Sequence, residues 1–184
     1  MENTEQKINE YYYDAMDCLS AGDTKTAMDL LQKAIAFDRH SVQTILGIAE
    51  VYKYKGDEEK AYSWIDKGFE EIKKQFPKWP KKMEWGDLDN RAYLRIIAHK
   101  ADYFCDTGKK EEGIELYKLL LKLNSNDNQG IRYLVAGIYK GITGGDINKM
   151  FDEGNRNQNW DKLEDLVEGQ NRIHKFWSHK GRTK

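Results

Sequence analysis

The histidines and cysteines of this 184-residue chain are the side chains that could catalyse a reaction or bind a metal ion. His99, His174 and His179 have no zinc-type spacing to a second ligand. Cys18 and Cys105 lie far apart in the chain, which fits neither a disulfide framework nor a paired metal site and indicates buried thiols in a reducing compartment. We therefore expect no metal ion and no cofactor.

Two further motifs could carry chemistry, and neither has the context that it needs. Gly141–Asp146 has the composition of a phosphate-binding loop but lacks the lysine and the preceding strand, which favours a turn between helices. Glu58–Glu59 and Glu111–Glu112 fall in the first turns of expected helices, where carboxylates favour the positive end of the helix dipole. No serine or cysteine lies in a recognisable nucleophile turn. We expect the protein not to be an enzyme.

A segment at about residues 76–93 combines positive charge with aromatic rings, as sites for single-stranded nucleic acids do. Its residues of interest are Phe76, Lys78, Trp79, Lys81, Lys82 and Trp85, with Lys73 and Lys74 just before it. The alternative is that the rings pack against neighbouring helices while the lysines are solvated. The balance of 30 Lys and Arg against 31 Asp and Glu favours this alternative and makes nucleic acid an unlikely partner. A third interpretation is a loop that extends a partner-binding surface.

The elements that must position these residues are helices that recur with a period of 34 residues. Gly22 and Gly56 each follow one apolar helical stretch and precede another, with Ala27 and Ala61 five positions later. The only two prolines of the chain both lie in the segment at about residues 76–93, so the rest is free to be helical. An internal repeat of this length predicts an array of helical hairpins.

The expected organisation is one domain over residues 1–178 followed by a basic tail at 179–184. Its first hairpin is predicted to comprise helices at 4–20 and 24–37. The repeats are placed at about 4–40, 41–75 and 90–127, with a divergent fourth at 128–158 and a capping helix at about 160–178. Gly56 and Gly108 are 52 residues apart, which is one period plus 18 residues. We call the segment at about residues 76–93 the insertion for this reason.

The repeats resemble the tetratricopeptide repeat family. Its signature places a large, a small and an aromatic residue on the first helix, glycine at the turn, and alanine, a large residue and alanine on the second helix. The three copies here read Tyr11, Ala15, Cys18, Gly22, Ala27, Leu31 and Ala34; Ile45, Ala49, Tyr52, Gly56, Ala61, Ile65 and Gly68; and Ile97, Ala101, Phe104, Gly108, Gly113, Tyr117 and Leu120. The proline that ends such repeats is missing, with Arg39, Lys73 and Ser125 at or near its place. The resemblance implies an all-α, right-handed solenoid of antiparallel helix hairpins.

A second resemblance concerns the junction before the fourth repeat. Asn124–Leu134, which follows a segment similar to Asn90–Arg95, is similar to a junction in certain bacterial repeat proteins. This likeness bears on the architecture more than on the function.

In the tetratricopeptide family, ligands lie along the concave face formed by the first helices. Carried over position by position, that face comprises Asn9, Tyr12, Tyr13, Met16, Gln43, Leu46, Glu50, Tyr54, Arg95, His99, Asp102, Gln129, Arg132, Tyr133 and Ala136. Aromatic and charged residues suit a peptide or protein segment, since rigid rings bury area at little entropic cost while charges fix the register. The alternative is that several are ordinary exposed residues of long helices.

The family also has a clamp for a partner's C-terminal carboxylate, which we expect to be absent. Its positions correspond to Tyr12, Met16, Gly47, Arg95 and His99, of which only Arg95 provides a suitable cation.

The predicted function is a non-catalytic scaffold or interaction module that binds a peptide or protein segment. The alternatives are single-stranded nucleic-acid binding through the insertion, or association with a second copy through the polar stretch Gly154–Asn159. Met1–Gln6 is polar where a signal peptide would be basic and then apolar, and no apolar run approaches the roughly 18 residues of a membrane span. We therefore expect a soluble cytoplasmic protein with no membrane partner.

Overall fold

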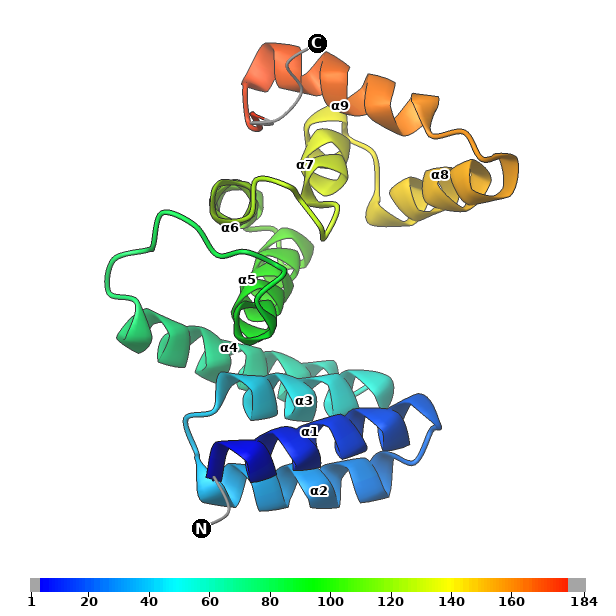
Figure 1. Ribbon diagram of the computed structural model, residues 1–184. Helices are drawn as coiled ribbons and strands as arrows, with labels where there is room; N and C mark the ends of the chain where they lie inside the picture. The colour runs from blue at the N-terminus through cyan, green and yellow to red at the C-terminus, as the bar shows by residue number, and fades with distance from the viewer. Residues whose placement is uncertain (1–3, 179–184) are drawn as a thin grey trace.

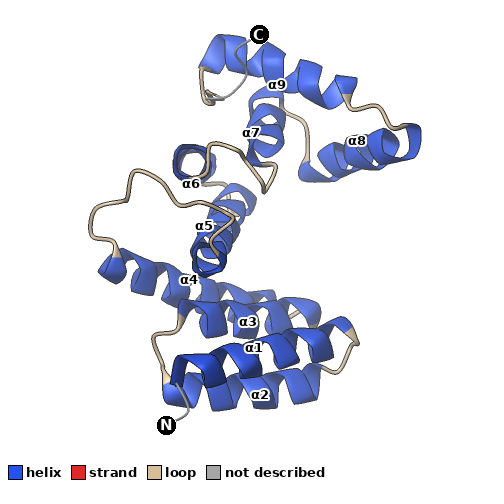
Figure 2. Cartoon of the chain, viewed as in Figure 1, coloured by secondary structure: helices blue, strands red, loops and turns tan. Residues whose placement is uncertain are grey.

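The computed structural model describes residues 4–178, and over this range the chain forms nine α-helices and no strand. Figure 1 shows the helices stacked one after another along the molecule, and Figure 2 shows the loops between them. The helices are α1 (Thr4–Ser20), α2 (Thr24–Phe37), α3 (Val42–Tyr54), α4 (Glu58–Gln75), α5 (Leu88–Asp106), α6 (Lys110–Leu123), α7 (Ile131–Lys140), α8 (Gly144–Asn157) and α9 (Asp161–His174). The all-helical prediction is confirmed, and α1 and α2 have the predicted bounds. The predicted basic tail at 179–184 lies outside the described residues.

Three hairpin turns each contain a glycine whose φ lies in the left-handed region. Gly22, Gly56 and Gly108 have φ angles of 83°, 73° and 82°. A residue with a Cβ is strained at such angles, whereas glycine adopts them readily. The sequence therefore ends α1, α3 and α5 at equivalent points.

Two of these turns also cap the returning helix. The Thr26 amide donates to Asp23 Oδ1 at 3.0 Å, and the Lys60 amide donates to Asp57 Oδ1 at 3.2 Å. Each cap satisfies an amide that the helix itself leaves unpaired, which stabilises the start of the helix. At the third turn the capping position is Lys109, which makes no such bond.

The first six helices pack in order. The most extensive contacts join α1 with α2, α3 with α4 and α5 with α6, and α3 also contacts α1 and α5. Small residues allow two further approaches, of α3 to α2 and of α4 to α5. A Cβ added at Gly47 would lie 2.7 Å from Leu31 Cδ2, and one added at Gly68 would lie 2.8 Å from Ile96 Cδ1. Both positions therefore need glycine for the observed packing.

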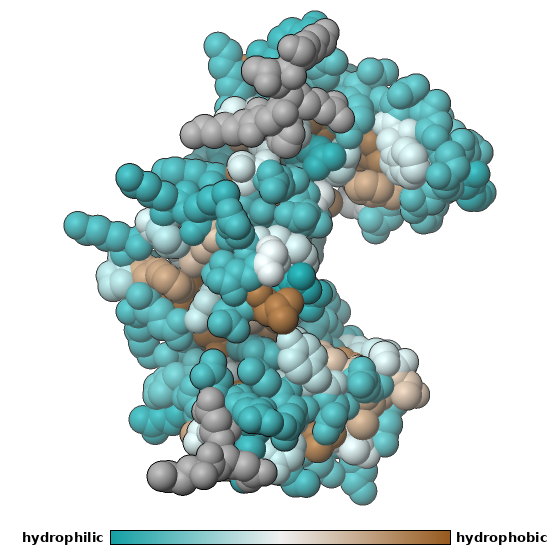
Figure 3. All heavy atoms as spheres, in the orientation of Figure 1, coloured by the Kyte–Doolittle hydropathy of each residue, from teal (hydrophilic) through white to brown (hydrophobic). Residues whose placement is uncertain are grey.

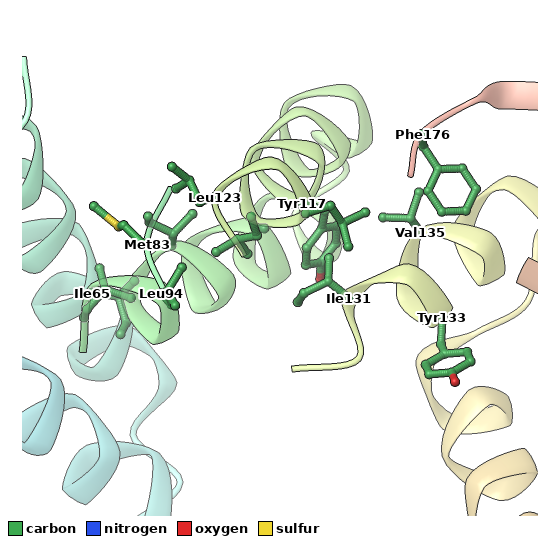
Figure 4. Packing of buried hydrophobic residues seen from close by; sticks show 14 of the residues in the cluster. Ile65, Met83, Leu94, Tyr117, Leu123, Ile131, Tyr133, Val135 and Phe176 are labelled. Carbon is green, nitrogen blue, oxygen red and sulfur yellow. The ribbon is translucent and has the colours of Figure 1, made fainter. Parts of the chain in front are cut away.

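The core continues from these hairpins into the insertion. Met83 is 2% exposed, and its amide donates to the Leu123 carbonyl at 2.8 Å. Figure 4 shows Met83 among Leu94, Leu123 and Ile65, with Phe176 beside Val135 farther along the core. The insertion is thus pinned to the helices that it connects.

The structure shifts three expected boundaries. Residues 88–93 of the insertion already belong to α5, which begins at Leu88 after the Asp87 cap. The first helix of the fourth repeat, expected at about residues 128–142, spans only Ile131–Lys140, and Gly141 ends it with a φ of 75°. The capping helix ends at His174, since Lys175 adopts the left-handed conformation with a φ of 49°.

The last three helices depart from the plan of the first six. α7 packs on α6, α8 and α9 but does not approach the α5 backbone closely, so the run of close packing from α1 through α3 to α5 stops there. Figure 1 shows α8 projecting away from the stack while α9 lies across α7. Among the described helices, none has both the length and the apolar character needed to cross a membrane.

Candidate functional site

A groove of about 500 Å³ lies between α3 and α4 on one side and α7 and α8 on the other, with residues of α5 and α6 between them. Figure 3 shows the molecule hollowed between the part that carries α8 and the part that carries α3 and α4. The groove is lined by Lys53, Glu58, Ala61, Tyr62, Ile65, His99, Asp102, Cys105, Asp106, Tyr117, Leu134, Ile138, Ile142, Gly144 and Ile147. We call it the α5–α7 groove.

A chain of polar contacts joins three helices at one wall of the groove. His99 Nε2 of α5 lies 2.9 Å from Glu50 Oε1 of α3. The other ring nitrogen, Nδ1, lies 3.6 Å from Asp102 Oδ2, and the Tyr117 hydroxyl of α6 donates to Asp102. Residues distant in the sequence thus form one connected network.

The network favours its charged form. Burial lowers the pKa of His99, but its hydrogen bonds with Asp102 and Glu50 outweigh burial and bring the pKa above the ordinary value of 6.5. The hydrogen bond from His99 lowers the pKa of Glu50 against the opposing effect of burial. Burial, followed by the Asp102 charge, raises the pKa of Tyr117, which keeps the phenol protonated as a donor.

These groups are poorly arranged for proton transfer or nucleophilic attack. Both ring nitrogens of His99 face carboxylates, which leaves neither for a bound molecule. Burial raises the pKa of the Cys105 thiol to about 11, so the reactive thiolate is scarce near neutral pH. Within residues 4–178, no three His, Cys, Asp or Glu side chains are grouped so as to hold a metal ion. This geometry suits charge pairing that holds these side chains in place.

The groove lining near the end of α5 carries excess negative charge. Glu58, Asp102 and Asp106 line the groove, and the cationic side chains of its lining are Lys53 and His99. Burial raises the pKa of Asp106, and the negative charges of Asp102 and Glu58 raise it further. A carboxyl group disfavoured in its charged form by neighbouring carboxylates marks a negative local potential.

The opposite wall is apolar. Leu134 and Ile138 are one helical turn apart on α7, and Ile142 follows in the loop before α8. All three are half-buried, in contrast to Ile65 and Ile147, which are 1% exposed at the base of the groove. The α5–α7 groove therefore sets an aliphatic wall against a carboxylate-rich one.

The predicted ligand residues divide between several places. His99 and Asp102 line the α5–α7 groove, with Glu50 bonded to His99. Asn9 and Gln43 instead line a separate cleft near the N-terminal ends of α3 and α5, whereas the groove lies near their C-terminal ends. These two sets do not form one continuous site.

Several other predicted ligand residues are buried or lie elsewhere on the surface. Leu46 is 1% exposed and packs in the core, because α3 is enclosed by α1, α2, α4 and α5. Tyr12 is 7% exposed, with its ring edge-on to Tyr13. Met16 is half-buried and Tyr13 and Tyr54 are exposed, while the Arg95 guanidinium lies 5.8 Å over the Trp85 ring. Leu46 cannot contact a ligand without rearrangement, which corrects its assignment.

The predicted residues of the fourth repeat hold the fold together. Arg132 donates to Asp127 Oδ2 at 2.9 Å, lies 3.3 Å from Glu164 Oε1 and covers the Tyr133 and Trp177 rings. The Tyr133 hydroxyl also donates to Glu164 of α9.

Two more residues of this repeat are structural. Gln129 donates to the Leu94 carbonyl at 3.4 Å, and Ala136 is fully buried. Gln129, Arg132, Tyr133 and Ala136 therefore connect α7 to its neighbours rather than lining the α5–α7 groove.

The rings of the insertion pack against neighbouring residues. The Trp79 ring lies 6.3 Å from that of Phe69, and Trp85 lies beneath the guanidinium groups of Arg91 and Arg95. The lysines Lys78, Lys81 and Lys82 are exposed. This arrangement matches the packed alternative considered from the sequence.

Sequence reasoning missed several residues of the groove. Glu58 was explained by the helix dipole and Tyr117 by the repeat signature, yet both line the groove. One signal was available, because Asp102 and Asp106 are like charges four residues apart on one helix, which is unfavourable without a nearby cation. Leu134 and Ile138 gave no signal, because their exposure depends on where α7 lies.

Comparisons of the chain with protein-family models, with curated proteins and with solved structures found no match.

Proposed function

We propose that this chain is a helical-repeat protein of the tetratricopeptide type, a non-catalytic interaction module that binds a protein or peptide segment in the α5–α7 groove. The groove carries this proposal. It combines an aliphatic wall with charged groups in about 500 Å³. Apolar contacts provide affinity at such sites, and a few fixed polar groups provide register and specificity.

The repeat assignment is supported by the three equivalent glycine turns. Gly22 and Gly56 are one period apart, each with a positive φ and a following aspartate that caps the next helix. Gly108 occupies the same position in the third hairpin. Tandem hairpins of this kind offer an extended face to a chain segment.

A protein segment fits the groove better than a compact small molecule. The lining extends from Lys53 and Glu58 of the second hairpin to Gly144 and Ile147 of α8. A segment can follow this course and place successive side chains against both walls. The Cys105 and His99 environments described above offer no evident reaction.

The test is selection of random dodecapeptides on the wild-type protein, followed by binding assays on a variant with a polar wall. In Leu134→Gln/Ile138→Gln, the apolar contact is lost, so we expect selected peptides to bind at least about tenfold more weakly. The control is Leu88→Gln/Ile173→Gln, which changes exposed apolar residues outside the groove lining. Equal binding by all three proteins would refute the proposal.

A second candidate function is binding of single-stranded nucleic acid at another surface. Lys81, Lys82, Lys118 and Lys122 line a cleft of about 600 Å³ together with Trp177. This convergence of lysines favours a polyanion, although the rings of the insertion are packed rather than presented.

An oligonucleotide titration at two salt concentrations tests this candidate. Binding at this cleft should weaken steeply with salt and should fall further in Lys81→Gln/Lys122→Gln. Lys7→Gln/Lys25→Gln, on the first hairpin, is the charge-matched control. Binding that is insensitive to both salt and the cleft variant would exclude the cleft as a nucleic-acid site.

A further inference from the structure

We propose that the segment bound in the α5–α7 groove is basic, carrying lysine or arginine next to aliphatic side chains. This inference rests on the proposed function and adds the chemistry of the partner. It derives from the opposition of a carboxylate-rich wall and an aliphatic wall in one groove.

The carboxylates that would meet the cation can be distinguished by their existing contacts. Asp102 accepts a hydrogen bond from Tyr117 and faces His99, so it is already engaged within the protein. Glu58 of α4 and Asp106 of α5 also line the groove, and their charges disfavour one another. A cationic side chain between Glu58 and Asp106 would relieve this repulsion, which gives the groove a preference for positive charge.

The aliphatic wall determines which side chains should lie next to that cation in the bound segment. Leu134, Ile138 and Ile142 are half-buried and remain in contact with solvent in the free protein. Covering them removes apolar surface from water, which a leucine, isoleucine or valine of the partner would do. The methylene stem of a lysine or arginine can also lie along this wall while its head reaches the carboxylates.

The same charges act against acidic partners. An aspartate or glutamate placed in the groove would face Glu58 and Asp106, whose negative potential is only partly offset by Lys53. Like-charge contacts reject a wrong partner more effectively than a missing contact does. The specificity is therefore opposite to that of a clamp for a carboxylate.

The experiment uses a phage library of random dodecapeptides selected on the full chain, with the most enriched peptides then synthesised with a fluorescein label. We expect lysine and arginine next to leucine, isoleucine or valine in these peptides. Their binding is measured by fluorescence anisotropy at about 50 mM and about 300 mM NaCl, where surface charges are screened to different extents. The variant Glu58→Gln/Asp106→Asn should weaken binding about tenfold at the lower salt and less at the higher salt.

The matched control is Asp29→Asn/Asp165→Asn, which removes the same charge from exposed positions on α2 and α9. Circular dichroism and thermal unfolding establish that each variant is folded before binding is measured. We expect the control to bind the selected peptides as the wild type does.

The outcomes separate this inference from the proposed function. Peptides without a basic excess, or equal binding to wild type and Glu58→Gln/Asp106→Asn, would overturn the inference. The proposed function would still stand if those peptides lost binding to Leu134→Gln/Ile138→Gln. If this wall variant bound all peptides as tightly as the wild type, both would be wrong.

Discussion

Two interfaces along the stack of helices differ in how they are closed. Between α3 and α5 the helices are in contact, and Ile45 of α3 and Ile96 of α5 both pack against Gly68 of α4. Between α5 and α7 the backbones do not approach closely, and the α5–α7 groove occupies that place. One interface is a closed core and the other is an open groove.

The residues that face each interface explain the difference. The closed interface contains aliphatic side chains such as Ile45 and Ile96, neither of which is exposed. The last turns of α5 carry Asp102 and Asp106 instead. Packing an apolar helix directly over Asp106 would bury its charge without a pairing cation, at a cost of several kcal/mol. The chain therefore attaches α7 to α9, through Arg132, and leaves its apolar residues half-covered.

The largest effect should come from a cavity in the closed interface. Ile96 is fully buried against Gly68, so Ile96→Ala should lower the free energy of unfolding by about 2–5 kcal/mol. Leu134→Ala, at the half-buried groove wall, should cost about 1 kcal/mol because solvent already reaches that side chain. Urea unfolding followed by circular dichroism measures both. Similar losses would mean that the two interfaces do not differ in packing.

Removing Arg132 should destabilise the packing of the last three helices. Asp127 is 5% exposed and would keep a buried charge without its cation, so Arg132→Ala should cost about 2–4 kcal/mol. Hydrogen exchange should accelerate in α7 and α9 while α1–α4 stay protected. Lys149→Ala, which removes an 80% exposed partner of Asp146, is the control and should cost less than about 0.5 kcal/mol. Uniform acceleration across the chain would argue against a separate C-terminal unit.

His99→Gln should cost an amount of stability that depends on pH. The pKa of His99 is raised above 6.5, so its pairing stabilises the fold fully below that value and is lost as the pH rises through the folded-state pKa. The pKa of Glu50 is lowered from 4.5, so its contribution to stability is present above that value. This contribution is lost as the pH falls through the folded-state pKa of Glu50.

Both contributions of the His99–Glu50 pair therefore act together between pH 4.5 and pH 6.5. We expect His99→Gln to cost about 1–2 kcal/mol within this window and less at about pH 9. Thermal unfolding across the pH range measures the difference. A cost that does not change with pH would indicate that His99 contributes packing alone.

The smallest predicted effect is a gain in the stability of the fold. The pKa of Asp106 is raised above 3.8, so the folded state holds this proton more tightly and is destabilised as the group ionises. Because Asp106 is exposed and solvent screens much of this repulsion, Asp106→Asn should stabilise the fold at neutral pH by only roughly 0.3–0.5 kcal/mol, with no gain at about pH 2, where folded and unfolded states are both protonated. Asp165→Asn should show no such pH-dependent gain. A loss of stability at neutral pH would show that the Asp106 carboxylate is compensated.

The hairpins could be predicted from the sequence because their causes are local. Gly22 and Gly56 supply the left-handed turn, Asp23 and Asp57 cap the next helix within three residues, and the apolar period of each helix defines its buried face. The bounds of α1 and α2 follow from these short-range features alone.

The tertiary structure alone decided the position of α7 and the composition of the site. Glu50, His99 and Tyr117 lie on three helices, and nothing near any of them in the sequence specifies the other two. Likewise, the buried state of Leu46 and the half-exposed state of Ile138 depend on which helices cover them. Turns and caps depend on neighbours a few residues away, whereas burial and charge pairing depend on side chains that only the folded packing brings together.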